Sequence, residues 1–329
     1  MRRMRAIEVG QSQDQLLWQE VPDVSPESGQ VLIEVAAAGV NRADLLQAAG
    51  KYPPPPGASP ILGLEVSGVI AEVGSEVSKW AVGQQVCALL TGGGYADHVV
   101  VPCGQLMPIP AGVSLQDAAG LPEVACTVWS NLVMTANLAP GEVLLIHGGA
   151  SGVGTHAIQL AKELGCTVAV TAGTPAKLDQ CRDLGADILI CYRDEDFVAR
   201  IRDVTAGAGA NVIFDIMGAS YLDRNLDALA PDGRLVIIGM QGGVEGELNI
   251  GKRFGKRLRV IGTALRGRPA PGPVGKNAIV TAVVESVWPM IAKCAVRPVI
   301  GAKFPIERAA DAHRALASGQ IVGKVLLTA

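Results

Sequence analysis

A short run of small residues is the strongest local sign of chemistry in this sequence. It follows the apolar residues 143–147 and precedes the helical pattern of residues 155–161. Its members are Gly149, Ser151, Gly152, Val153 and Gly154. On the pattern G-x-G-x-x-G, Gly149 and Gly154 match and Ser151 takes the middle position. With a helix N-terminus behind it, the run predicts a turn that binds a dinucleotide pyrophosphate, to which the Ser151 hydroxyl could donate; the alternative is a packing turn.

The residues after the predicted second strand bear on which dinucleotide is bound. Domains that select NAD usually present an Asp or Glu there, which accepts hydrogen bonds from the ribose diol. Here residues 167–171 lead into Gly173, Thr174 and Lys177, with no carboxylate. Gly173 leaves room, Thr174 offers a hydroxyl and Lys177 a positive charge, so we predict NADPH. A capped helix start, with Thr174 as N-cap, is the simpler explanation, and both can hold together.

The elements that must position these residues follow from the hydrophobic pattern. Beyond residue 139, short apolar runs alternate with helical stretches, which is typical of parallel βαβ units. We expect strands near residues 143–147, 167–171, 188–191, 212–215, 234–239 and 258–263. Helices are expected over residues 153–164, 176–184, 197–205 and 221–229. This predicts a doubly wound Rossmann sheet, with Gly218, Gly239 and Met240 facing the cofactor from strand ends, unless the glycines only make turns.

The first third of the chain has a different pattern, with short β-branched strands that suggest a small barrel. These strands are expected near residues 31–35, 68–74, 85–89 and 96–101. The proline run of residues 51–57 predicts a stiff extended loop. Beyond residue 266, helices are expected over residues 276–292 and 306–318, and strands over 299–304 and 323–327. The last strand is expected to return to the first domain, which gives domains of residues 1–124 with 266–329, and 125–265.

Composition limits the classes of function that remain. At ~150 residues per domain, 329 residues suggest two domains. The net charge of 28 − 31 = −3 gives no positive field for nucleic acid or an anionic membrane. Seven cysteines without a Cys-x-x-Cys pair argue against disulfides or a cysteine-rich zinc site. No apolar stretch reaches the ~20 residues of a membrane span, and the basic N-terminus lacks the apolar segment of an export signal. We expect a soluble cytoplasmic protein without nucleic-acid or membrane partners.

Several segments carry a resemblance to a known family. They are residues 39–45, 63–68, 148–154, 157–161 and 323–325. The chain resembles, from end to end, the medium-chain dehydrogenase/reductase superfamily, and within it the zinc-free quinone oxidoreductase (zeta-crystallin-like) family. Residues 51–59, together with residues 41–45, look most like the subgroup of the tumour-suppressor-induced NADPH quinone oxidoreductase. The resemblance implies an α/β fold in which a GroES-like β-barrel catalytic domain and a Rossmann domain flank an active-site cleft. It also implies a homodimer paired through residues 258–263, with a tetramer left open.

The same resemblance bears on metal binding. Zinc-containing members hold their catalytic metal with Cys, His and Cys, at positions that correspond here to Asn41, Leu64 and Glu123. Asn and Leu supply neither thiolate nor imidazole, so we predict neither a catalytic nor a structural zinc. Without a metal to polarise a carbonyl, the expected acceptor is an electron-poor quinone or an activated C=C bond.

The resemblance also assigns roles to single residues. Tyr52 and Asn41 would line the cleft as candidate hydrogen-bond donors to the forming oxyanion. The alternative for Tyr52 is an aromatic side chain that only fills space, and the alternative for Asp44 is to anchor the segment. Asn41, Thr127 and Lys324 are expected to contact the cofactor, Thr127 beside the nicotinamide ribose. The residues that match family positions for the 2′-phosphate are Gly173, Thr174, Lys177 and Tyr192.

The expected function is an NADPH-dependent quinone reductase acting on a small-molecule, quinone-like substrate. One alternative is an NADPH-dependent reductase of enones or enoyl thioesters. Another is a non-catalytic NADPH-binding protein, crystallin-like or RNA-binding. The basic residues Arg253, Lys256, Arg257 and Arg259 form a local cluster, for which a solvated face or a subunit contact is the simpler explanation.

Overall fold

The computed structural model describes residues 3–329, whose internal contacts form two compact units. The barrel unit comprises residues 3–126 and 265–329, and the Rossmann unit is Thr127–Ala264. The sequence analysis expected the Rossmann domain to span residues 125–265, two residues earlier at its start and one residue later at its end. Within the described residues, no helix is long and apolar enough to span a membrane.

The Rossmann unit is built on a parallel six-stranded sheet in the order β10-β9-β8-β11-β12-β13. Its strands are β8 (Val143–His147), β9 (Thr167–Ala172), β10 (Ile188–Cys191), β11 (Ala210–Asp215), β12 (Leu229–Ile237) and β13 (Arg259–Gly262). The chain runs outward from β8 to β10 and then crosses to β11, so the strand order reverses between β8 and β11. Such a reversal is where doubly wound sheets bind ligands. The predicted Rossmann sheet is confirmed.

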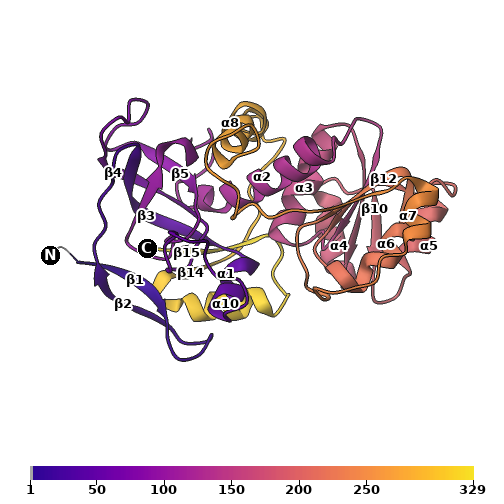
Figure 1. The fold of residues 1–329 in the computed structure, drawn as a ribbon, viewed down its shortest axis with the longest axis horizontal. Helices are drawn as coiled ribbons and strands as arrows, with labels where there is room; N and C mark the ends of the chain where they lie inside the picture. Colours follow the sequence, from indigo (N-terminus) through magenta and orange to yellow (C-terminus); the bar gives the residue numbers. More distant parts are fainter. Residues whose placement is uncertain (1–2) are drawn as a thin grey trace. The chain divides into compact units, whose positions relative to one another are not determined.

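Helices between these strands pack against the sheet (Figure 1). They are α3 (Gly152–Glu163), α4 (Pro175–Asp183), α5 (Phe197–Val204), α6 (Leu222–Ala228) and α7 (Ile250–Lys256). The sequence pattern missed α7, which is only seven residues long and buries no side chain. The strand expected over residues 234–239 begins earlier, so that residues 231–233 lie inside β12. There Asp232 adopts a left-handed φ of 61° and the register with β11 shifts, so the extra residues form an irregularity within the strand.

The barrel unit contains a sheet in the order β14-β15-β3-β4-β5-β7, with β6 paired to β3, and a separate hairpin. The hairpin is β1 (Arg3–Val9) and β2 (Leu16–Pro22). The sheet consists of β3 (Gln30–Val40), β4 (Glu65–Val73), β5 (Gln85–Leu89), β6 (His98–Pro102), β7 (Leu106–Pro108), β14 (Ile300–Pro305) and β15 (Lys324–Thr328). β15 runs antiparallel to β3, with Val325 opposite Val40. The predicted return of the last strand to the first domain is therefore confirmed.

The helices associated with this unit are short. They are α1 (Arg42–Ala48), α2 (Pro122–Val128), α8 (Lys276–Ser286), α9 (Trp288–Ala292) and α10 (Ala309–Ala317). α2 begins in the barrel unit and is followed by a π-helix, Trp129–Thr135, which was not predicted. The single helix expected over residues 276–292 was wrong. It divides at Val287, because Pro289 has no N–H to continue the first helix and suits the first turn of a new one.

Candidate active site

The turn between β8 and α3 is closed by Ser151. Ser151 is the N-cap of α3, and its Oγ accepts a hydrogen bond from the Gly154 amide at 3.0 Å. The same hydroxyl donates to the Gly148 carbonyl oxygen at 2.7 Å. Its one hydrogen is thus used inside the turn instead of pointing at a ligand. The turn can therefore bind an anion through its backbone N–H groups. Those of Gly152 and Val153 are available because no carbonyl group lies one helical turn before them to accept their hydrogen bonds.

Two glycines of the motif are required by close packing. A Cβ on Gly154 would lie 2.4 Å from the Gly148 carbonyl oxygen, and one on Gly149 would lie 2.7 Å from Cβ of Val170. Both distances are far below van der Waals contact, so a side chain at either position would force the turn open. The structure therefore accounts for Gly149 and Gly154 by close approach and leaves the amide face of the turn free of side chains.

The four residues expected around a 2′-phosphate gather at the carboxyl ends of β9 and β10. A Cβ on Gly173 would lie 2.5 Å from the Tyr192 hydroxyl oxygen, so these two residues are in direct contact. Thr174 is the N-cap of α4 and its Oγ1 accepts from the Lys177 amide at 3.4 Å. The helix-capping explanation for Thr174 is therefore confirmed, and its hydroxyl hydrogen remains available to another acceptor.

The ends of β11 and β12 carry a further polar residue that the sequence analysis missed. Asp215 is buried, accepts from the amides of Met217 at 2.8 Å and Gly218 at 2.9 Å, and has a pKa raised to about 6 by burial. Gly218 and Gly239 leave no space for a Cβ, while Met240 is 59% exposed. The sequence signal that could have identified Asp215 is an acidic residue at the end of an apolar strand. Asp215 fixes the backbone next to Gly218.

Thr127 lies at the end of α2, at the start of the Rossmann unit. Its carbonyl oxygen accepts from the Asn131 side-chain amide at 2.8 Å. The Thr127 hydroxyl has no hydrogen-bond partner within the described residues and its side chain is half-buried. This leaves the hydroxyl available to a ligand, as the resemblance implies.

In the barrel unit, Asn41 and Lys324 belong to one buried ionic network. The Lys324 ammonium contacts Glu65 Oε1 at 2.6 Å, Asn41 Oδ1 at 2.6 Å and the Val40 carbonyl oxygen at 3.2 Å. Asn41 Nδ2 donates to Glu65 Oε1 at 2.9 Å. Gly39 makes room for this carboxylate, since a Cβ there would meet its Oε1. All three ammonium hydrogens are therefore used within the barrel unit, and the pairing of β15 with β3 sets this contact.

Asp44 holds the Asn41 segment in place. Its carboxylate accepts from the amides of Asn41 at 2.7 Å and Gly63 at 3.0 Å, and its side chain is completely buried. Burial raises the pKa of Asp44 to about 6, although both hydrogen bonds and Lys324 oppose this. The side-chain amide of Asn41 donates to Glu65 Oε1 and, at 3.4 Å, to the Gly39 carbonyl oxygen. The anchoring role suggested for Asp44 agrees with these bonds.

Tyr52 lies in a cationic part of the barrel unit. The Arg266 guanidinium carbon is 5.4 Å from the centre of the Tyr52 ring, and Arg266 also donates to Gln47 Oε1 and the Thr91 carbonyl oxygen. Lys276 donates to the Thr91 hydroxyl at 2.7 Å. Arg266 and Lys276 are each 4% exposed, and neither forms an ion pair within the described residues. The sequence analysis missed both cations, because each belongs to a segment without a recognisable motif.

The positions that would hold a catalytic zinc do not form a metal site. Leu64 is apolar and 1% exposed, Asn41 contributes an amide, and Glu123 is the only ionisable side chain of the three. Within residues 3–329, no group of three or more His, Cys, Asp or Glu side chains is arranged to hold a metal ion. These donors do not suit zinc, which prefers thiolate and imidazole.

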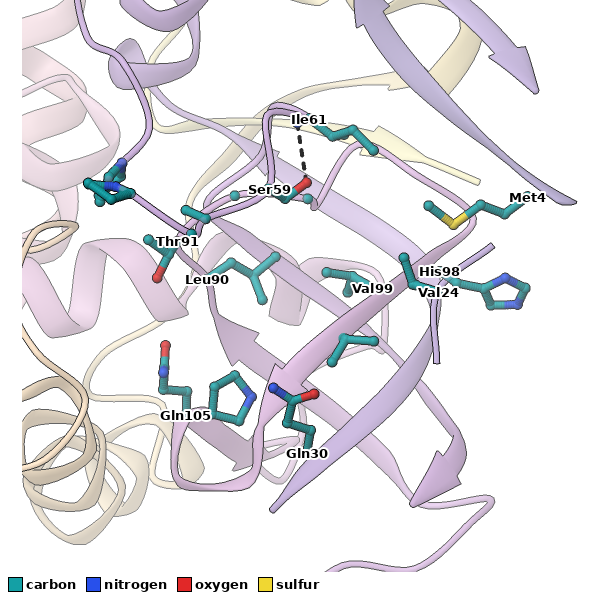
Figure 2. A pocket seen from close by; sticks show the side chains of 18 residues that line it. Met4, Val24, Gln30, Ser59, Ile61, Leu90, Thr91, His98, Val99 and Gln105 are labelled. Atoms are coloured by element: carbon teal, nitrogen blue, oxygen red, sulfur yellow. Dashed lines mark hydrogen bonds between the residues drawn. The ribbon is translucent and has the colours of Figure 1, made fainter. Parts of the chain in front are cut away.

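A cavity of about 440 Å³ lies elsewhere in the barrel unit, between the loop of residues 55–59 and β6 (Figure 2). Thr91 and Gln105 provide polar groups in its wall, and Leu90 and Val99 provide apolar ones. Ser59 Oγ accepts from the Ile61 amide at 3.2 Å at its upper edge. None of the predicted site residues lines this cavity within the described chain, but Thr91 in its wall accepts hydrogen bonds from Arg266 and Lys276, so the cavity borders the Tyr52 group.

Comparison with known proteins agrees with this geometry. Residues 27–111 match the family described as Alcohol dehydrogenase GroES-like domain, and residues 152–276 match Zinc-binding dehydrogenase. The chain is 31% identical to a 2-haloacrylate reductase of Burkholderia sp over 95% of both chains. It belongs to the medium-chain dehydrogenase/reductase superfamily. It is therefore an oxidoreductase.

Solved structures of this superfamily match the whole chain. Escherichia coli quinone oxidoreductase, complexed with NADPH, superposes with a TM-score of 0.88 at 29% identity, covering 99% of each chain. The CurK enoyl reductase superposes with a TM-score of 0.85 at 28% identity, covering 99% of this chain and 98% of that one. The predicted combination of a GroES-like domain with a Rossmann domain is confirmed. Both kinds of acceptor occur among these relatives.

Proposed function

We propose that this chain transfers hydride from NADPH to a quinone or a similarly electron-poor acceptor. The observation that carries the proposal is that Asn41, Leu64 and Glu123 occupy the positions of the zinc ligands. The neighbouring Lys324 ammonium is already paired with Glu65. Without a Lewis acid, an acceptor must be one that takes hydride with little help. The similarity to quinone oxidoreductases supports this choice.

The Rossmann unit fits NADPH. The amides of Gly152 and Val153 would bind the pyrophosphate, and the Gly149 and Gly154 positions leave the space it needs. Gly173, Thr174, Lys177 and Tyr192 would hold the 2′-phosphate, with no carboxylate there to repel it. When bound, the cofactor supplies the hydride.

The barrel unit would hold the acceptor. The half-buried Tyr52 offers a hydroxyl, and burial, followed by the negative charge of Glu123, raises its pKa above the usual value. Tyr52 would therefore stay protonated and donate a hydrogen bond to the oxyanion that forms as the acceptor is reduced. Asn41, fixed by Glu65 and Lys324, would shape the same region.

Reduction of an activated C=C bond is the second candidate function, and one observation favours it. Arg266 and Lys276 are buried without a carboxylate partner in the described residues. Buried charges are normally paired, so this pair suits an acceptor that carries a carboxylate or develops negative charge. The 31% identity to a 2-haloacrylate reductase agrees with such an acceptor.

An acceptor panel tests the proposal. NADPH oxidation is measured with ortho- and para-quinones, enones, 2-haloacrylates and crotonyl thioesters, with semiquinone detection. We expect the highest kcat/KM with a quinone. Higher values with 2-haloacrylate or an enone would favour the second candidate, and NADPH binding without turnover of any acceptor would favour the non-catalytic alternative.

We also propose a cytoplasmic homodimer without nucleic-acid partners. β13 is the outer strand of the Rossmann sheet and could pair with a second copy. The basic cluster beside it is partly used internally. Lys256 donates to three carbonyl oxygens at the end of α6, and Arg257 contacts Asp232 through two hydrogen bonds. Light scattering would give the number of copies.

A further inference from the structure

His147 is a buried histidine to which the proposed function assigns no role. It is the last residue of β8, directly before the turn that leads into α3, and it is 1% exposed. Its ring stands edge-on to the rings of Phe197 and Tyr221, with centroids 4.8 and 4.9 Å away and interplanar angles of 74° and 85°. This packing fixes the plane of the imidazole, so that one nitrogen faces Thr171 of β9 and the other faces Asn225 of α6.

The hydrogen bonds of this ring determine which nitrogen carries the proton. Nε2 lies 2.8 Å from Asn225 Oδ1, an amide oxygen that can only accept, so Nε2 donates. The amide nitrogen of Asn225 is buried and has no partner within the described chain. Burial lowers the pKa of His147 to about 4, so the ring is neutral at neutral pH and Nδ1 carries no proton. Nδ1 therefore accepts the hydroxyl hydrogen of Thr171, whose Oγ1 lies 3.2 Å away.

Thr171 connects the ring to the turn. Because its hydroxyl hydrogen is used toward His147, Oγ1 can accept a hydrogen bond, and it does so from the Gly148 amide at 3.3 Å. The Thr171 carbonyl oxygen accepts from the amide of Gly149 at 3.0 Å. Gly148 in turn accepts at its carbonyl oxygen from the Ser151 amide at 2.9 Å and the Ser151 hydroxyl at 2.7 Å. The donors from the Gly148 amide to the ring thus all point in one direction, away from the turn.

Gly148 is a residue at which the turn could change conformation. Its φ of 73° lies in the left-handed region, which glycine adopts as readily as other conformations. If the peptide group between His147 and Gly148 rotated, the Gly148 N–H would lose Thr171. Leaving a buried donor and a buried acceptor without partners is costly. The chain of hydrogen bonds therefore holds the turn in the conformation that keeps the amides at the start of α3 available.

We propose that His147, acting through Thr171 as the neutral Nε2–H tautomer, is a positioning residue that holds the turn ready for the pyrophosphate. The proposal rests on the NADPH binding proposed above. Asn225 sets the tautomer from α6, because its Oδ1 accepts the Nε2 hydrogen. The ring takes no part in the chemistry, and its proton stays on Nε2 when the cofactor binds.

Long-range ¹H–¹⁵N NMR spectra of the protein without cofactor test the state of the ring. We expect the neutral Nε2–H tautomer from pH 8 down to pH 6, because burial and then the charge of Arg224 lower the pKa of His147. The signals are assigned by their absence from His147→Gln. In Asn225→Leu, which removes the acceptor of the Nε2 hydrogen, the Nδ1–H tautomer should appear. An Nδ1–H tautomer in the wild type, or titration at the ordinary histidine pKa of 6.5, would overturn the proposal.

Affinity for NADPH tests the positioning role. Thr171→Val keeps the shape of the side chain and removes the hydroxyl, so that Nδ1 of the ring and the Gly148 amide both lose their partner. Kd for NADPH should rise by about tenfold or more, while kcat at saturating NADPH stays close to the wild-type value. NADH contains the same pyrophosphate and should lose affinity by the same factor. Thr171→Ser, which retains the hydroxyl, should bind NADPH nearly as the wild type does.

Thr205→Val is the matched control. Thr205 follows α5, and its hydroxyl also donates to a carbonyl oxygen, that of Ile201 at 2.7 Å, and accepts from a glycine amide, that of Gly209 at 2.9 Å. It precedes β11, at the edge of the parallel sheet where strands begin, whereas the turn follows the end of β8. Thr205→Val should therefore leave Kd for NADPH unchanged.

Two results of the affinity measurements would overturn the proposal. One is a wild-type Kd in Thr171→Val, and the other is an equal loss of affinity in Thr171→Val and Thr171→Ser. A wild-type protein that binds neither NADPH nor NADH would overturn the proposed NADPH binding instead. The NMR spectra need no cofactor, so the tautomer of His147 is determined in either case.

Discussion

The phosphate turn of the Rossmann unit and the Lys324 network of the barrel unit are built on opposite principles. The turn is made of backbone, with glycines that exclude side chains and a serine that caps a helix. The network is made of charged side chains, with Lys324 and Glu65 buried at 2.6 Å from each other. A turn of the first kind tolerates no added atoms. A network of the second kind tolerates no lost charge.

The difference also separates what each region can bind. Backbone amides at a helix start are fixed donors whose charge does not change with pH, which suits a phosphate present in every turnover. The barrel unit instead holds carboxyl groups with raised pKa values, Asp44 and Glu123, next to cations. Such a region can exchange protons. The phosphate turn and the region around Lys324 thus differ in whether their charges can change with pH, and each variant below breaks one side of that comparison.

The largest effect is expected from Lys324→Met. This change leaves the Glu65 carboxylate fully buried without its cation, and breaking such a pair costs about 3–5 kcal/mol. Urea unfolding should show this loss. The control is Lys303→Met in β14, whose partly exposed pair with Asp117 should cost about 0–1 kcal/mol. A loss below about 1 kcal/mol in Lys324→Met would mean that the network does not stabilise the barrel unit.

Next in size is Gly154→Ala. Its Cβ would lie 2.4 Å from the Gly148 carbonyl oxygen, and backbone atoms cannot move aside without opening the turn. We expect NADPH affinity to fall by at least about a hundredfold, equivalent to roughly 2.8 kcal/mol. Fluorescence titration with NADPH measures it. Gly255→Ala in α7, where a Cβ would meet nothing within 4 Å, should bind as the wild type does. Equal affinities in both variants would contradict the role of the turn.

The same division explains what the sequence could predict. The turn and its strands were predictable, because glycine spacing and alternating apolar runs are local patterns. The contact between Lys324 and Glu65 joins strands far apart in the sequence, and only the sheet pairing brings them together. Arg266 and Lys276 lacked any motif, so their burial near Tyr52 could not be anticipated. Glu123 was recognised only as a displaced metal position, since a pattern carries no information on burial or neighbouring charge.

Lys177→Ala should have a smaller effect that is specific to one cofactor. A charge-assisted hydrogen bond to the 2′-phosphate is worth about 1.5–3 kcal/mol, and each ~1.4 kcal/mol is tenfold in affinity. KM for NADPH should rise roughly ten- to a hundredfold, while KM for NADH barely changes. NADH is the internal control, since it lacks the phosphate. Equal kcat/KM for NADPH and NADH in the unmutated protein would refute the preference itself.

The smallest effect is expected from Tyr52→Phe, which removes one hydroxyl and keeps the ring. The ring lies 5.4 Å from the Arg266 guanidinium carbon, a contact that phenylalanine also makes, so the loop should keep its position. One neutral hydrogen bond is worth about 0.5–1.5 kcal/mol, which predicts a fall in quinone kcat/KM of up to about tenfold. Tyr52→Leu removes ring and hydroxyl together and should lose more. Wild-type activity in Tyr52→Phe combined with low activity in Tyr52→Leu would show that Tyr52 shapes the barrel unit by packing and donates nothing to the acceptor.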